Sequence, residues 1–261
     1  MLQSVCLIIT QVLVGSPRPN LLQLLLREPY IQGQLPYLEK AVTWAGNHSL
    51  KFIVDLHCAP ASQNGFDNSG HRIPFPQSQA DQTNIQRTDA IIKTIANMFK
   101  GNTNVVPIIA PLNEPTGFEG RAVLDTARQG SISLLPAGTS KLTSFGTGTT
   151  DMATFGTLTD PLKKAILTVL LHDAFQPLSY WNGFMNLPGW QGVAMDTHIY
   201  QMFSDADVAR TNAQYISAAC QMEDSSELGL WLIVGKWTPA TTDCAKYLNG
   251  RGIGARYDGE N

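Results

Sequence analysis

The feature that most constrains the fold is the alternation of short apolar runs with segments whose apolar residues recur at helical spacing. The runs that fit strands lie at 5–14, at 52–56, at 105–112, at the start of 165–186, within 191–203 and at 230–234. The segments with helical spacing are 35–45, 83–100 and 208–220. Strands separated by helices indicate an α/β fold with a mainly parallel sheet. With 261 residues, the chain is long enough for one barrel-sized domain.

The overall composition excludes several classes of protein. An apolar content of 43% with 15% charged residues is typical of a folded globular chain. A net charge of −3 gives no reason to expect a nucleic-acid partner, and no run reaches the ~18 apolar residues of a membrane span. The four cysteines lack metal-ligand spacing; Cys220 and Cys244 either pair in an oxidising compartment or stay as thiols.

Polar residues follow several of the apolar runs. The stretch LGLWLIVGKWTPATTDCAKYLNG (228–250) holds a strand that we expect to be buried and to end at Gly235, followed by Lys236 and Trp237. The stretch NVVPIIAPLNEPTG (104–117) ends in Asn113-Glu114-Pro115. Side chains that follow the carboxyl ends of parallel strands gather at one end of a barrel and form its site.

These stretches, with EPYIQGQLPYLEKAVTWAGNHSLKFIVDLHCAPASQNGFDNSG (28–70), resemble glycoside hydrolase family 5 in its fungal exo-1,3-β-glucanase (glucan 1,3-β-glucosidase) branch. The resemblance covers 28–120 and 165–258 and implies a (β/α)8 TIM-barrel type of fold. The family's strands three to seven are recognisable, so we expect an incomplete barrel with open sheet edges. Residues 1–27 form an atypical N-terminal segment, and the Gly-, Ser- and Thr-rich stretch 121–160 is predicted to be an irregular insert in a domain spanning 28–258.

The resemblance assigns the acid/base carboxyl to Glu114 and places Lys236 where the family has its nucleophilic glutamate. Retaining glycosidases need two carboxyl groups about 5 Å apart. An ammonium group is not a nucleophile at neutral pH unless strongly desolvated, and a nearby cation also lowers the pKa of Glu114 and leaves it ionised. Three aspartates in matching segments are not placed by the motifs to substitute for the nucleophile: Asp173, Asp196 and Asp243.

Two hypotheses for the function follow. The first is a glucan exo-1,3-β-glucosidase-like hydrolase that turns its substrate over very slowly or not at all. The second is a non-catalytic β-glucan-binding pseudoenzyme or a truncated gene product. In both, the expected partner is β-1,3-glucan or a related glucoside. No cofactor or metal is expected, because the histidines lack ligand spacing and are taken to be neutral.

The resemblance also implies the residues of a sugar-binding subsite. His57, His198 and Tyr200 would line it, and Asn113 would bind the sugar 2-hydroxyl. The other candidates are Phe66 and Phe203, which either stack on glucose rings or pack in the core, Asn68, which either reaches hydroxyls or caps a turn, and Trp237.

The family relationship implies an extracellular or cell-wall location. The start, MLQSVCLIITQVLVGS, has an apolar stretch of signal-peptide length but no Lys or Arg before it, so a signal peptide is doubtful. Asn47-His48-Ser49 is an N-glycosylation acceptor that would matter in a secreted product.

Overall fold

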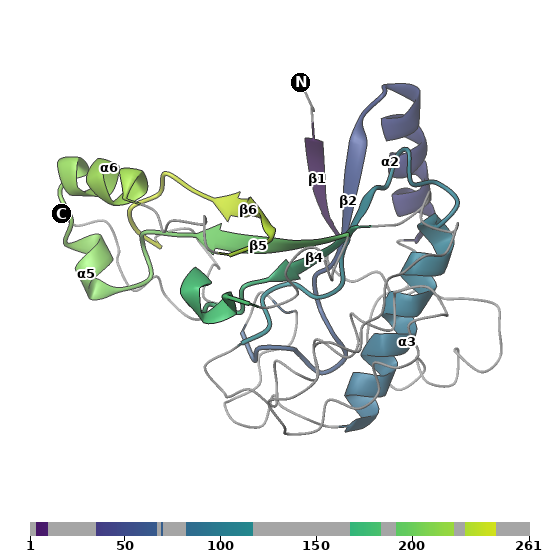
Figure 1. Ribbon diagram of the computed structural model, residues 1–261, viewed down its shortest axis with the longest axis horizontal. Helices are drawn as coiled ribbons and strands as arrows, with labels where there is room; N and C mark the ends of the chain where they lie inside the picture. The colour runs from purple at the N-terminus through teal and green to yellow at the C-terminus, as the bar shows by residue number, and fades with distance from the viewer. Residues whose placement is uncertain are drawn as a thin grey trace.

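A computed structural model describes residues 4–9, 35–66, 69, 82–116, 168–183, 192–221 and 228–243. Its strands are β1 (Ser4–Ile9), β2 (Lys51–Leu56), β3 (Ile108–Ala110), β4 (Thr168–His172), β5 (Val193–Ile199) and β6 (Trp231–Trp237). They form one parallel sheet in which the spatial order is the chain order, β1 to β6. This order is that of a (β/α)8 barrel, and among the described strands β1 and β6 each have a single neighbour, so the barrel is incomplete (Figure 1). The predicted fold class is therefore confirmed.

The helices are α2 (Leu35–Asn47), α3 (Gln82–Phe99), α5 (Asp205–Val208) and α6 (Asn212–Cys220), with a 3-10 turn, η5 (Leu178–Trp181). In Figure 1, α2 and α3 lie on the side of β2, and α5 and α6 lie at the far end of β5 and β6. None of the helices within the described residues is long and apolar enough to cross a membrane.

The helix expected over 208–220 is shorter in the structure, where α6 begins at Asn212 and Val208 ends the preceding helix α5. Ser204 caps α5 by accepting a hydrogen bond from the Asp207 N–H. Thr211 begins α6 with a capping box: its hydroxyl accepts from the Gln214 N–H, and the Gln214 side chain accepts from the Thr211 N–H. Cys220, at the end of α6, forms no disulfide within the part of the chain that the structure describes, and its candidate partner Cys244 lies outside that part.

Strand β3 is shorter than the predicted 105–112 because two prolines bracket it. Pro107 and Pro111 stand on either side of Ile108–Ala110. Proline has no N–H to donate to the ladder, so it is excluded from the paired part of a central strand. Val105 and Val106 instead close a turn, with their N–H groups donating to the Asn102 carbonyl.

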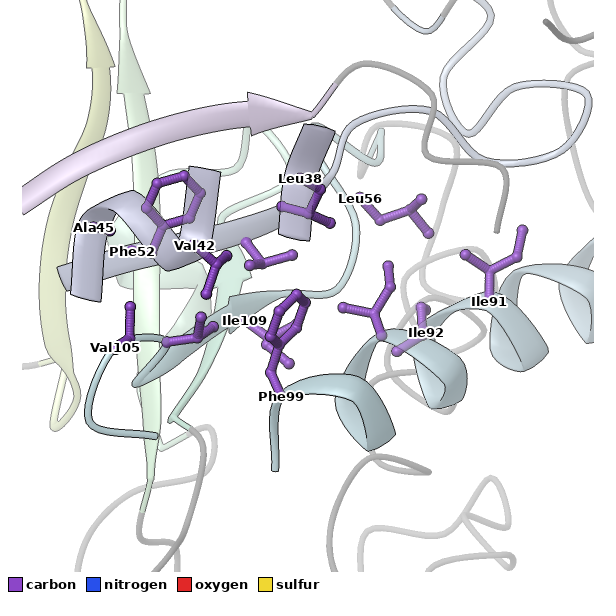
Figure 2. Close-up of a cluster of buried hydrophobic side chains, with 13 residues drawn as sticks. Leu38, Val42, Ala45, Phe52, Leu56, Ile91, Ile92, Phe99, Val105 and Ile109 are labelled. Carbon is purple, nitrogen blue, oxygen red and sulfur yellow. The ribbon is translucent and has the colours of Figure 1, made fainter. Parts of the chain in front are cut away.

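The larger hydrophobic core lies between the sheet and helices α2 and α3. Residues on one face of β2 point toward the helices, because successive strand residues alternate in direction. Figure 2 shows these side chains interdigitating with those of both helices. The cluster comprises Leu38, Val42, Ala45, Phe52, Val54, Leu56, Ile91, Ile92, Ile95, Phe99, Val105, Val106 and Ile109.

The other face of the sheet carries a small apolar layer followed by a polar one. The apolar layer consists of Ala110, Leu170 and Ala194, with Ile53, Ile108 and Ile233 packed against it. Two residues further along their strands, on the same face, come Asp55, His172 and Asp196, all buried. The sheet therefore places a buried polar layer at the carboxyl ends of its strands, above an apolar floor.

Strand β6 differs from the expectation of a buried strand ending at Gly235. It continues through Lys236 to Trp237. Trp231 and Trp237 are 77% and 70% exposed, because β6 is the last of the described strands and β5 is its only neighbour among them. The expected insert at 121–160 lies outside the described residues, as does Asn68.

Candidate active site

Glu114 lies at the centre of the polar layer, in the loop that follows β3, with a buried side chain and a backbone φ of 45°. This left-handed conformation is uncommon for a residue other than glycine and persists where neighbouring groups hold it. The loop after β2 supplies those groups. Asn64 donates from its side-chain amide to the Glu114 carbonyl at 2.9 Å, and Gln63 donates to the carbonyls of His57 and Asn113 at 2.8 and 2.7 Å.

Lys236 reaches the same layer because of an irregularity in the β5–β6 pairing. Val234 pairs with Thr197 and Lys236 pairs with His198, so Gly235 is an extra residue in β6. Registered neighbours in a sheet share a face, and the extra residue therefore turns Lys236 to the side of His198. A side chain here would displace Asp196, since a Cβ at position 235 would lie 2.3 Å from the Asp196 carboxylate oxygen that accepts the Gly235 N–H.

Two cationic side chains contact the Glu114 carboxylate. Lys236 Nζ donates to Glu114 Oε1 at 3.1 Å and to Asn113 Oδ1 at 2.7 Å. His198 Nδ1 lies 2.6 Å from the same Glu114 oxygen, and its Nε2 lies 3.1 Å from Asp196 Oδ2. His198 thus bridges two carboxylates, and Glu114 is paired with an ammonium and an imidazole.

These contacts set the protonation of the cluster. Burial by itself would raise the pKa of Glu114, but the hydrogen bond from His198 and the charge of Lys236 outweigh it and hold that pKa far below its usual range. Burial would likewise lower the pKa of His198, yet its bonds to Asp196 and Glu114 raise it. The carboxylate neighbours of His198 therefore shift it toward the imidazolium form.

The remaining predicted residues lie around this cluster. His57 is buried, with Nδ1 2.8 Å from Asp55 Oδ2. Burial, followed by the negative charges of Glu114 and Asp196, raises the pKa of the half-buried Tyr200. The rings of Phe66 and Phe203 are 42% and 45% exposed, so neither is a core residue.

Two aromatic pairs and one outlying tryptophan complete the predicted set. Phe203 contacts Tyr200, with ring centroids 5.5 Å apart, and Phe66 lies 6.3 Å from Phe175. Trp237 is exposed at the end of β6, beside Lys236 in the chain.

The sequence interpretation missed His172, which closes β4. This buried residue accepts a hydrogen bond from the Ala174 N–H at Nδ1, and its ring packs edge-on against His198 with centroids 4.2 Å apart. A sequence signal was present, because His172 ends the apolar run of β4 much as His57 directly follows that of β2.

Glu114, His172 and His198 offer one donor atom each within 4.8 Å of one another, which is close enough for a metal ion. The surroundings do not fit one. Both ring nitrogens of His198 already contact carboxylates, and the Lys236 ammonium shares the Glu114 oxygen. A further cation would meet two positive groups already in place.

Asp196 and Asp173 hold neighbouring groups in position. Asp196 contacts His198 and the Gly235 N–H. Asp173 accepts hydrogen bonds from the Thr197 hydroxyl at 2.5 Å and from the Phe175 N–H at 2.9 Å. Burial nonetheless raises the pKa of Asp173 to about 6, against the effect of these two bonds.

No protein-family model matches the chain. Among curated proteins, the glucan 1,3-β-glucosidase of Blumeria graminis is 39% identical over 234 residues, which are 89% of this chain and 49% of that protein. The probable glucan 1,3-β-glucosidase A of Emericella nidulans is 39% identical over 235 residues, 89% of this chain and 51% of that protein. The chain is thus similar in sequence to glucan 1,3-β-glucosidases over 89% of its own length. It spans about half the length of the curated relatives it matches.

The fold of this chain is also found among solved structures. Rutinosidase from Aspergillus niger matches with a TM-score of 0.53 at 19% identity, over 81% of this chain and 57% of that one. At this identity the likeness concerns the fold alone. The resemblance predicted from the strand-end motifs is confirmed by the curated relatives.

Proposed function

We propose that this chain is a β-1,3-glucan-directed member of the glucan 1,3-β-glucosidase family that binds its substrate but hydrolyses it very slowly or not at all. Support for the substrate class comes from the names of its relatives. Support for the lost turnover comes from one contact, between Lys236 Nζ and Glu114 Oε1 at 3.1 Å.

The contact removes the acid that leaving-group departure requires. A general acid must carry a proton near neutral pH, and glycosidases keep one carboxyl protonated by raising its pKa. Here the pKa of Glu114 is shifted in the opposite direction. Glu114 is therefore held as a carboxylate, paired with Lys236 and His198.

The same lysine takes the place that we assign to the nucleophile. The register of β6 brings position 236 opposite His198, facing Glu114. A carboxylate there would attack the anomeric carbon and stabilise an oxocarbenium-like transition state, whereas an ammonium opposes that positive charge.

The groups proposed to bind sugar are retained around the blocked centre. We assign hydrogen bonds with sugar hydroxyls to His57, Asn113, His198 and Tyr200. Asn113 keeps its side-chain N–H donors without a partner among the described residues, since only its Oδ1 is engaged by Lys236. The exposed rings of Phe66 and Phe203 would stack on glucose faces; Asn68 and Trp237 complete the proposed set on the strength of the motifs.

The deciding experiment compares glucose release from laminarin by the wild type, Lys236→Glu and Lys93→Glu. Lys93 is an exposed lysine of α3, so it controls for charge reversal alone. Restoring a carboxylate should return both the nucleophile and a protonated Glu114. General acid catalysis alone contributes roughly 10²–10⁴-fold, so we expect at least a hundredfold gain for Lys236→Glu and none for Lys93→Glu.

Equal rates for the wild type and Lys236→Glu would sink the proposal that Lys236 blocks turnover. Laminarin binding by the wild type, measured by calorimetry, separates the remaining alternatives. Binding without hydrolysis supports the pseudoenzyme, and slow hydrolysis supports an impaired enzyme. A broad, non-cooperative thermal transition without binding supports a truncated product that does not fold alone.

We further propose an extracellular or cell-wall location, as glucan chemistry would require. It is supported by the glycosylation acceptor Asn47, which is exposed at the end of α2. A glycan on the Asn47 peptide of the native protein, found by mass spectrometry, would support this location; an unmodified peptide would count against it.

A further inference from the structure

His172 has two ring nitrogens in different situations. Nδ1 accepts the Ala174 N–H at 3.0 Å, which places the ring proton of the neutral form on Nε2. Burial, with the charge of His198 acting in the same direction, lowers the pKa of His172 well below its usual value, so the neutral form is the one present. His172 therefore presents one fixed N–H donor, at Nε2.

That donor is buried and has no acceptor among the described residues. The His172 side chain is 2% exposed, and the ring is held edge-on by two neighbours, His198 at 4.2 Å and Phe175 at 5.1 Å between centroids. Buried N–H groups without a partner are rare, because leaving one unsatisfied destabilises the folded state.

The unsatisfied Nε2–H of His172 lies next to the proposed sugar subsite. A ring nitrogen of His172 lies within 4.8 Å of a carboxylate oxygen of Glu114 and of a ring nitrogen of His198, so the ring borders the proposed sugar subsite. Phe175, which packs on His172, is 40% exposed and lies 6.3 Å from Phe66, one of the proposed stacking rings. His172 thus lies between the Glu114–His198 pair and the exposed rings of Phe175 and Phe66.

We propose that His172 is a ligand-binding residue whose Nε2–H donates to a sugar oxygen of bound β-1,3-glucan beside Glu114. This inference rests on the proposed function, and it adds a residue to the sugar subsite. The alternative is a packing role, in which the ring only fills space between His198 and Phe175.

Two substitutions separate the roles of the two nitrogens. In His172→Asn, the side-chain oxygen replaces Nδ1 as acceptor for the Ala174 N–H, and the Nε2 donor is lost. In His172→Gln, the longer amide retains a donor near Nε2, and the Nδ1 acceptor is lost. Each variant is therefore the control for the other.

The experiment titrates the full chain with laminaritriose, a β-1,3-linked trisaccharide, by calorimetry, and records the melting temperature of each variant. For His172→Asn we expect about a tenfold weaker Kd with a melting temperature close to that of the wild type. For His172→Gln we expect a lower melting temperature, with a Kd within about threefold of the wild type.

Unchanged laminaritriose affinity in His172→Asn would overturn the inference while leaving the proposed function in place. A larger loss of melting temperature in His172→Asn than in His172→Gln would overturn it as well, since it would mean that the protein itself satisfies Nε2–H. If the wild type does not bind laminaritriose, the proposed function fails, and the assignment of a glucan to His172 fails with it.

Discussion

Single charges decide the chemistry of this polar layer. Lys236 and His198 both contact the Glu114 carboxylate, and Asp196 holds the other side of His198. Lys236 and His198 alternate with two carboxylates within hydrogen-bonding distance, and these neighbours shift the pKa values of Glu114 and His198. The charge of Lys236 is one of the causes that lower the pKa of Glu114, which is why Lys236→Glu is expected to act on Glu114 as well as at position 236.

A second carboxyl, Asp173, gives a pH dependence with a definite sign. Its pKa is raised from 3.8 to about 6 in the folded state. Between these values the folded chain binds a proton that the unfolded chain has released, so the contribution of Asp173 to stability falls as pH rises through this window. Asp173→Asn should remove this fall, on the order of 3 kcal/mol between low pH and pH 7.

The measurement is urea unfolding of the wild type and Asp173→Asn at pH 4 and pH 7. The exposed Asp205→Asn controls for loss of a surface carboxylate. If the difference between wild type and Asp173→Asn is the same at both pH values, the raised pKa of Asp173 is refuted.

At the scale of elements, sequence periodicity predicted α2, α3 and most strand positions, because a helix stripe or an apolar run is a local property. The bulge at Gly235 was not predictable in this way. Register is a relation between β5 and β6, so the sequence of one strand does not determine which residue of the other strand lies opposite each of its own residues. For the same reason, the pairing of Lys236 with His198 could not be predicted from either strand alone.

Gly235→Ala tests the bulge. The added Cβ would meet the Asp196 carboxylate at 2.3 Å and displace it from the Gly235 N–H and from His198. Overpacking of this kind destabilises by about 1–3 kcal/mol, to be measured as a shift in urea midpoint.

Gly101→Ala is the matched control, because a Cβ at position 101 meets no atom within 4 Å. We expect its stability to change by less than about 0.5 kcal/mol. Equal midpoints for the two variants would show that position 235 has room for a side chain and that the bulge is not fixed by the Asp196 contact.

At the scale of the whole molecule, packing is uneven across the sheet. The larger cluster joins α2 and α3 to β2 and β3, whereas a smaller one around Trp181 and Met195 lies near β5. The fold class followed from strand and helix alternation, and the motifs at strand ends supplied the candidate site residues. The exposure of β6 could not be predicted from its apolar run, since whether such a run is covered depends on neighbours elsewhere in the chain.

This uneven packing predicts uneven protection of the backbone. Strand β2 is paired on both sides and covered by two helices, while β6 is paired with β5 alone among the described strands. Hydrogen exchange followed by mass spectrometry should show amides of 51–56 exchanging at least about tenfold more slowly than those of 231–237. Equal protection of both peptides would contradict this prediction.

The two side-chain amides after β2 have a consequence for protein engineering. Gln63 and Asn64 fasten the backbone of Asn113 and Glu114 to a loop that lies about fifty positions earlier in the chain. A designer who transplants either segment into a relative without the other would leave Glu114 free to abandon its left-handed conformation. The two loops are therefore one interchangeable part, to be grafted together or not at all.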